Sequence, residues 1–138
     1  MVVTAIAQGI ATHPEHQIKT CFGRLPTNGK PFWTMTPDDY FDTVFATFVF
    51  CSVPDPVLGL KELRRICKPE GRLILLEHMR PANPVLGLLF DLVNPLVVRM
   101  MGANINRLTI DNIQSAGWQI KIEQKLSSDI VKWIEATP

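Results

Sequence analysis

Two polar residues end an apolar run in this sequence, and their side chains could move protons. Glu77 and His78 directly follow "RLILL". A carboxylate beside an imidazole can act as a general acid or base when a hydroxyl or carbon nucleophile must lose a proton. The structural alternative is that Glu77 caps a neighbouring helix while His78 binds a loop carbonyl. We predict Glu77 and His78 as the catalytic pair and leave that alternative open.

A second apolar run, "FDTVFATFVF", ends in the polar segment "CSVPDP". The run shows no alternation of apolar and polar residues, which is typical of a strand covered on both faces in a parallel sheet. Cys51 is a conceivable nucleophile, but no helper base stands near it in the sequence. The usual role of such a cysteine is that of a small buried apolar residue.

The elements around these two runs predict a βαβ unit. A strand is expected over residues 41–50, followed by a helix that Asp55 caps and Pro56 begins. The helix runs through residue 68, and "PEG" then makes a type I turn into a strand over residues 72–78. Parallel strands present their carboxyl ends at one edge of the sheet, where ligands bind. Residues 47–55 and 77–80 should therefore meet at that edge.

The apolar segment over residues 83–105 could be mistaken for a membrane span. It contains Asp91, Asn94, Pro95 and Arg99, and polar groups at mid-bilayer depth are costly. We expect a helix over residues 83–101 that breaks at Pro95 and is buried or lies against an apolar ligand. A lid over an apolar acceptor, plain core packing and a dimer face all remain open.

The flanking segments give weaker signals. A strand is expected over residues 2–7, a helix within "THPEHQIKTC" and a loop over residues 22–39. Near the other end, a short helix should be capped by Thr109 and stopped by Gly117. An antiparallel hairpin should follow, formed by "WQIKIEQ" and "DIVKWIEA". Residues 118, 120 and 122 should then point inward.

Composition narrows the classes of function. The chain has 138 residues and a formal charge of +1, without a basic run interleaved with aromatics, so nucleic acid is not an expected partner. Three cysteines without C-x-x-C spacing favour a reducing, cytoplasmic location, and the first residues, which lack a basic region, are not expected to act as a signal peptide. His13 and His16 are one helical turn apart, but no third ligand is evident. We expect no metal site.

The order of these pieces resembles the carboxyl-terminal half of a class I S-adenosylmethionine-dependent methyltransferase. The likeness is carried by "FDTV", "CSVPDP", "LLEH" and "NINR…AGW", which together are specific. It is similar to the branch of ubiquinone/menaquinone-biosynthesis, phospholipid and thiol methyltransferase-like proteins. The implied fold is an α/β, Rossmann-like sheet of order 3-2-1-4-5-7-6. Strand 4 would be residues 41–50, strand 5 residues 72–78, and the final hairpin strands 6 and 7.

The resemblance also implies a cofactor and site residues. S-adenosylmethionine would lie with its methionine and ribose side against the segment after strand 4. The implied cofactor-binding residues are Ala46, Thr47, Phe48, Cys51, Ser52 and Val53. Asn104, Asn106 and Arg107 in "GANINR" would either orient a substrate or only secure their loop.

Three departures from the family pattern affect the cofactor. The sequence contains no G-x-G-x-G loop, no acidic residue after a strand 2 formed by "VVTAIA", and no "DAxxLPF" before strand 4. A fourth, "KPEG" in place of "KPGG", should be harmless. We therefore expect one N-terminally truncated domain over residues 1–138, with an atypical segment 1–39 and a family-like core 40–138.

Two functions follow from the resemblance. The first is methyl transfer to a small-molecule or lipid-like acceptor such as a quinone precursor, phospholipid or thiol. The alternative is a catalytically impaired remnant of the fold that acts as a binding or interaction module. Both are compatible with a peripheral membrane contact and with a homodimer.

Overall fold

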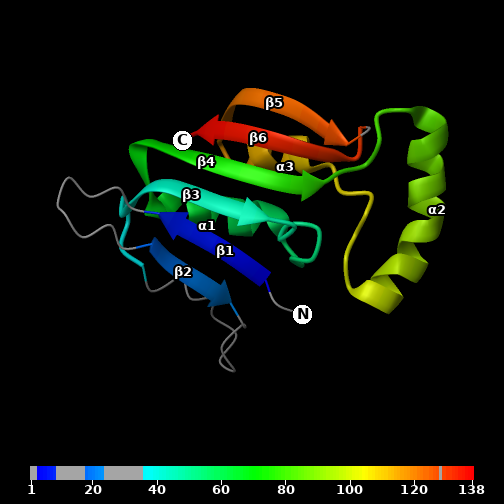
Figure 1. Cartoon of the computed structure of the whole chain (residues 1–138), viewed down its shortest axis with the longest axis horizontal. Coiled ribbons are helices and arrows are strands. Elements are labelled where there is room, and N and C mark those ends of the chain that lie inside the picture. The colour runs from blue at the N-terminus through cyan, green and yellow to red at the C-terminus, as the bar shows by residue number, and fades with distance from the viewer. Residues whose placement is uncertain (1–2, 9–17, 24–35, 128) are drawn as a thin grey trace.

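The structure is a computed structural model, and it describes residues 3–8, 18–23, 36–127 and 129–138. The described strands form one sheet in the order β2-β1-β3-β4-β6-β5 (Figure 1). The elements are β1 (Val3–Gln8), β2 (Ile18–Gly23), β3 (Phe41–Thr47), α1 (Pro56–Ile66), β4 (Cys67–His78), α2 (Pro84–Met101), α3 (Thr109–Ser115), β5 (Gln119–Ser127) and β6 (Val131–Thr137).

The predicted βαβ unit is confirmed. β3 and β4 are parallel neighbours, and α1 connects them. β3 ends at Thr47, three residues before the predicted end, because Phe48 has a φ of 51° and turns the chain. The predicted turn at residues 69–71 is wrong. These residues already belong to β4. The pairing with β3 shifts register between Phe41 and Thr43, so that residues 68–71 lie between the partners of these two residues, Cys67 and Arg72.

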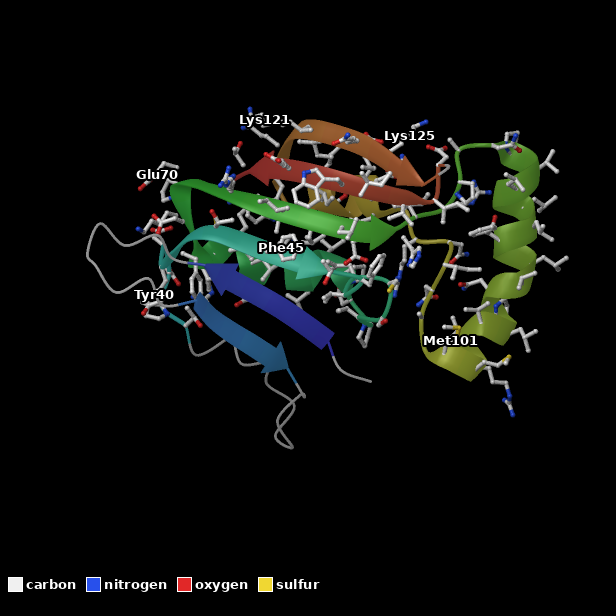
Figure 2. The ribbon with its side chains drawn as sticks, in the orientation of Figure 1. Tyr40, Phe45, Glu70, Met101, Lys121 and Lys125 are labelled. Atoms are coloured by element: carbon white, nitrogen blue, oxygen red, sulfur yellow. The ribbon has the colours of Figure 1, made fainter. Side chains whose placement is uncertain are left out.

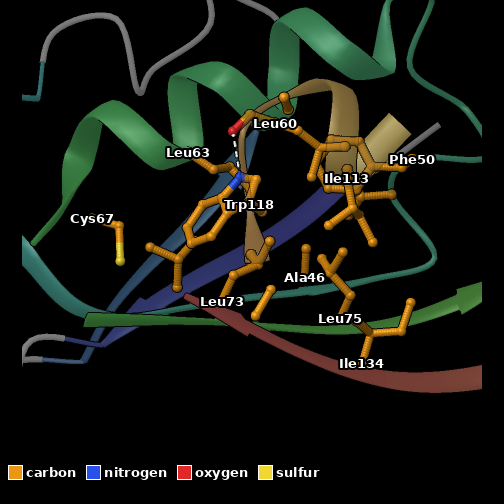
Figure 3. Close-up of a cluster of buried hydrophobic side chains, with 14 of the residues drawn as sticks. Ala46, Phe50, Leu60, Leu63, Cys67, Leu73, Leu75, Ile113, Trp118 and Ile134 are labelled. Carbon is orange, nitrogen blue, oxygen red and sulfur yellow. Dashed lines mark hydrogen bonds between the residues drawn. The ribbon is translucent and has the colours of Figure 1, made fainter. Parts of the chain in front are cut away.

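The start of α1 follows the capping rule. The Asp55 side chain accepts a hydrogen bond of 2.9 Å from the amide of Leu58, and proline occupies the first helical position. On the side facing the sheet, Leu60 and Leu63 are buried. They pack in one cluster with the inward residues of the strands, among them Leu73, Leu75 and Ile134 (Figure 3).

Only one face of the sheet is covered by helices, α1 and α3, among the residues that the structure describes (Figure 1). Along the second half of β4, buried residues alternate with half-buried ones. The half-buried set includes Ile74 and Leu76, and their neighbour Phe45 on β3 lies near Trp133 on β6, with ring centroids 6.1 Å apart. The prediction of a strand fully covered on both faces is therefore wrong for this sheet.

The amino-terminal strands are arranged differently from the implied order. The strand predicted over residues 2–7 is confirmed as β1, but it pairs antiparallel with β3. Ile18 to Cys21 lie in β2, so the predicted helix is wrong there; β-branched and aromatic residues such as Ile18, Thr20 and Phe22 suit a strand. The earlier part of the predicted helix, with His13 and His16, lies outside the described residues, as does most of the predicted loop.

The carboxyl-terminal part follows the predicted order with two corrections. Gly117 has a φ of +89° and ends the turn after α3, as predicted. Thr109 is not the cap: it is the first helical residue and is buried, while Leu108 occupies the cap position. The antiparallel hairpin of β5 and β6 is confirmed, but a register shift after Ile120 leaves Ile122 exposed rather than inward.

α2 contradicts the predicted break and the alternative of plain core packing, while the lid and the dimer face stay predictions. The helix continues through Pro95, begins after the capping side chain of Asn83 and ends at Gly102 in the left-handed conformation. Gly87 is its one buried residue. α2 stands apart from the helices on the sheet, beyond the ends of β3 and β4 (Figure 1).

Candidate functional site

The carboxyl ends of β3 and β4 lie side by side at one edge of the sheet. Thr47 pairs with Leu76, and the amide of Phe48 donates a hydrogen bond of 2.8 Å to the Leu76 carbonyl. We call residues 47–53 and 77–80 the carboxyl edge. The two segments that were predicted to meet do so here.

Glu77 organises the carboxyl edge from inside. Its side chain is fully buried, and its Oε1 accepts hydrogen bonds of 2.7 Å and 3.0 Å from the amides of Val49 and Phe50. Its Oε2 has no partner among the described residues. Burial raises the pKa of the Glu77 carboxyl from 4.5 to about 7, because desolvation outweighs the hydrogen bonds that favour the charged form. Glu77 therefore holds the backbone turn after β3.

The turn itself places three side chains with different exposure. Phe48 is in the left-handed region and 42% exposed, whereas Cys51 is buried. The Cys51 thiol donates to the Phe48 carbonyl at 3.3 Å and lies 3.4 Å from the Ser52 hydroxyl. Burial raises the pKa of the Cys51 thiol, which disfavours the nucleophilic thiolate. The structure supports the expectation that Cys51 acts as a small packed residue.

The structure does not bring the predicted catalytic residues Glu77 and His78 together. Successive residues of a strand point to opposite faces, so Glu77 lies on the helix-covered face and His78 on the other. The His78 ring stacks at a tilt of 33° on the Phe48 ring, with centroids 4.5 Å apart. The contacts of Glu77 match the capping alternative, with a turn in place of a helix. A catalytic role for either residue stays a prediction.

The six residues implied to bind the cofactor divide into two groups. Thr47, Ser52 and Val53 are half-buried and Phe48 is exposed, so these four can contact a ligand at the carboxyl edge. Ala46 and Cys51 are buried and lie behind that surface. Their predicted contact with a cofactor is untested.

The predicted substrate residues hold their loop to the carboxyl edge. Asn104 donates its amide and its Nδ2 to the Cys51 carbonyl, at 2.7 Å and 3.3 Å. Arg107 donates Nη2 to the Val53 carbonyl at 2.8 Å, and Asn106 donates Nδ2 to Asp91 at 3.1 Å. These bonds support the alternative in which the three residues secure the loop.

Sequence reasoning missed the polar side of α2. Asp91 accepts three hydrogen bonds of 2.8–3.2 Å from Arg80, and Asn94 bonds to Asn104 and to the amide of Ile105. Hydrogen bonds from Arg80 and Asn106 lower the pKa of the Asp91 carboxyl. Asp91 and Asn94 are three residues apart and share one helix face. Two polar residues at this spacing within an apolar run could have predicted a polar side of the helix.

Comparison of the sequence with known proteins gives a consistent relationship. A family model described as a methyltransferase domain matches residues 30–75. The chain is 34% identical over 67 residues to a ubiquinone/menaquinone biosynthesis C-methyltransferase of Hahella chejuensis, covering 49% of this chain and 27% of that protein. It is 33% identical over 85 residues to a demethylmenaquinone methyltransferase of Clavibacter sepedonicus, covering 59% and 35%. The chain thus spans about a third or less of these relatives.

Solved structures share the fold at lower identity. A SAM-dependent methyltransferase from Thermotoga maritima, described as a possible histamine N-methyltransferase, has a TM-score of 0.55 and 24% identity, covering 75% of this chain and 58% of that one. The 4+2 cyclase SpnF has a TM-score of 0.60 and 15% identity, covering 75% and 51%. These likenesses establish the fold, and the cyclase shows that the fold alone does not define the reaction.

In fold, strand order and sequence the chain is similar to the class I S-adenosylmethionine-dependent methyltransferases. The observed order β3-β4-β6-β5 corresponds to strands 4-5-7-6 of that class. Of the two relatives above, one is named a ubiquinone/menaquinone biosynthesis C-methyltransferase and the other a demethylmenaquinone methyltransferase.

S-adenosylmethionine is the methyl donor of this class, and the described residues fit it only in part. The carboxyl edge is where the resemblance places the wall of the donor site after β3. The strand beside β3 is β1, which runs antiparallel and therefore ends at the opposite edge, near Thr43. The sequence has no G-x-G-x-G loop to hold the amino-acid end of the donor. No metal-binding cluster of His, Cys, Asp or Glu occurs among the described residues.

Proposed function

We propose that this chain takes part in methyl transfer from S-adenosylmethionine to a small, lipid-like acceptor, with the carboxyl edge as its site. The observation that carries the proposal is the parallel pair β3 and β4, whose ends meet in a turn fixed by a buried carboxylate. Relatedness to quinone-biosynthesis methyltransferases supports a quinone precursor as the acceptor. A phospholipid or a thiol remains within the same chemical range.

The residues at the edge would act mainly by placement. Methyl transfer from a sulfonium is an in-line displacement, and much of its rate comes from holding donor and acceptor in line and excluding water. Phe48 and Val53 offer apolar contact, and the Ser52 hydroxyl offers a hydrogen bond. Glu77 would keep the turn in place. His78, beside Phe48, is the residue that could accept a proton from an acceptor hydroxyl.

A second candidate function is favoured by the reversed direction of β1. Without a glycine-rich loop at the end of a parallel neighbour of β3, the described residues provide one wall of a donor site. The chain would then be a catalytically impaired member of the fold that serves as a binding or interaction module. Donor binding separates the two functions.

The test is calorimetric titration of the purified chain with S-adenosylhomocysteine. Phe48→Ala should weaken binding by about tenfold, because one face of a partly exposed aromatic ring is lost from the contact. Tyr40→Ala is the matched control: its ring is 43% exposed, and it precedes β3 at the opposite edge of the sheet (Figure 2).

Binding by the unmodified chain and by Tyr40→Ala, with a loss in Phe48→Ala, would support a donor site at the carboxyl edge. Absence of binding up to millimolar ligand would favour the binding module. Equal loss in both variants would place the ligand elsewhere.

A further inference from the structure

The outward face of α2 is apolar along its whole length. Val85, Leu92 and Met100 are 76%, 77% and 75% exposed. The other exposed apolar residues of this face are Leu86, Leu88, Leu89, Val93 and Leu96. Together these side chains expose roughly 800 Å² of apolar surface, more than the few hundred Å² that monomers usually show in one patch. Figure 2 shows α2 standing apart from the sheet, with Met101 at the end of the helix.

The polar side of the same helix is already occupied. Asp91 is bound to Arg80 and Asn106, and Asn94 to Asn104 and Ile105. α2 is therefore an amphipathic helix with its polar side fixed to the protein and its apolar side turned outward. This is the reverse of an ordinary surface helix.

We infer that this outward face binds the surface of an anionic lipid bilayer, with α2 lying in the plane of the interface. The exposed arc, from Leu88 through Val85 to Leu86, covers about 160° at 3.6 residues per turn. A second helix packed on α2 would contact only a seam of about two residues in seven. A lipid phase would cover the whole arc, which favours a bilayer over a second copy of the chain.

The charges around the helix suit an anionic surface. Residues 79–108 contain three arginines, at positions 80, 99 and 107, and one acid, Asp91. Arg80 is paired with Asp91 on the inner side, and Arg107 donates to the Val53 carbonyl. The outward arc therefore carries one exposed charge, the cation of Arg99, and no acid. Arg99 is in the last turn, from which a long side chain can reach the lipid headgroups.

A membrane-spanning orientation conflicts with the same contacts. α2 is long and apolar enough to be a candidate span by length and composition. At 1.5 Å per residue its 18 residues extend about 27 Å, slightly less than a hydrocarbon core of about 30 Å. Spanning would also pull Asp91 and Asn94 away from their partners in the middle of the helix.

Vesicle binding tests the inference without any methyl donor, so it can fail independently of the proposed function. The full chain is mixed with phosphatidylcholine vesicles, with and without phosphatidylglycerol, and co-sedimentation is measured. The variant carries Leu92→Glu and Leu96→Glu. The matched control carries Leu58→Glu and Leu126→Glu, at leucines exposed on α1 and β5. Thermal melts establish that both variants fold.

We expect the chain and the control to bind vesicles that contain phosphatidylglycerol, and the α2 variant to bind at least about tenfold more weakly, since two apolar contacts are lost. Absence of vesicle binding, or equal binding of both variants, would overturn the inference. A dimer that the α2 variant dissociates, without vesicle binding, would assign the face to a second copy instead.

A depth measurement distinguishes the in-plane orientation and needs no destabilised variant. Tryptophan is placed singly at Val85, Leu92 or Met100, three exposed positions spread along the helix. Quenching by lipids brominated along the acyl chain is compared with that of the unmodified chain. Equal added quenching at the three positions is expected for a helix in the plane. Deep quenching at Leu92 alone would indicate a span and overturn the inference.

Discussion

Replacing Glu77 with glutamine should remove a pH dependence from the stability of the fold. The Glu77 carboxyl has a pKa of about 7 in the folded chain, raised from 4.5 by burial. The folded state therefore holds this proton over a pH range in which the unfolded chain has released it. By linkage, stability falls as pH rises from about 4.5 to about 7, and the loss is complete above that range.

The magnitude follows from the size of the shift. At 1.36 kcal/mol per pKa unit, the displacement from 4.5 to about 7 corresponds to roughly 3 kcal/mol of unfolding free energy. Glutamine is neutral at every pH in this range and keeps an acceptor for the amides of Val49 and Phe50. Its NH₂ group replaces Oε2, which has no partner among the described residues. The variant should thus lose the slope and keep most of the low-pH stability.

The assay is urea unfolding followed by tryptophan fluorescence at several pH values between about 5 and 8. The difference between the chain and the variant isolates Glu77, because all other titrating groups are common to both. Glu77→Ala is the companion variant: it leaves two buried amides unpaired and should cost about 2–4 kcal/mol even near pH 5. Equal pH slopes in the chain and in Glu77→Gln, or a chain that gains stability with rising pH, would refute the reasoning.

Three further predictions concern single contacts. Asp55→Ala should lower the unfolding free energy by about 1 kcal/mol through loss of the α1 cap, and an unchanged urea midpoint would contradict this. Trp118→Phe removes the 2.9 Å bond from Nε1 to the buried Leu60 carbonyl (Figure 3). It should cost about 1–3 kcal/mol in the same assay, whereas a neutral effect would mean that the carbonyl finds another donor. Arg80→Ala should speed amide hydrogen exchange across α2, because Asp91 loses its main partner; unchanged exchange would mean that other contacts hold the helix.

The central βαβ unit could be predicted because its signals are local. One arrangement of strand, helix and strand agrees with all the local signals. These are the two apolar runs, the helix start at Asp55 and Pro56, and the apolar positions Leu60 and Leu63 on the side of the helix that faces the sheet. The meeting of the two strand ends at one edge then follows from topology. The opposite orientations of Glu77 and His78 were also within reach, since adjacent strand residues alternate.

Other features depend on long-range contacts that pattern does not encode. The direction of β1 is decided by which strand it pairs with, so a short apolar run predicts a strand without its sense. Hydrophobicity predicts burial for α2, but its bonds through Asp91 and Asn94 turn the apolar side outward. The second face of the sheet is only half-buried because no described helix packs on it, and the strand sequences do not encode which elements pack on a face.

The loop over residues 104–107 is hydrogen-bonded both to α2 and to the segment that follows β3. Asn104 bonds to the Cys51 carbonyl on one side and to Asn94 of α2 on the other, while Arg107 and Asn106 make parallel links to Val53 and Asp91. A tilt of α2 would therefore strain hydrogen bonds that reach the backbone after β3. If lipid binds at α2 and a ligand binds at the turn after β3, each should change the affinity of the other. The factor should be the same in both directions, since coupling between two sites is reciprocal.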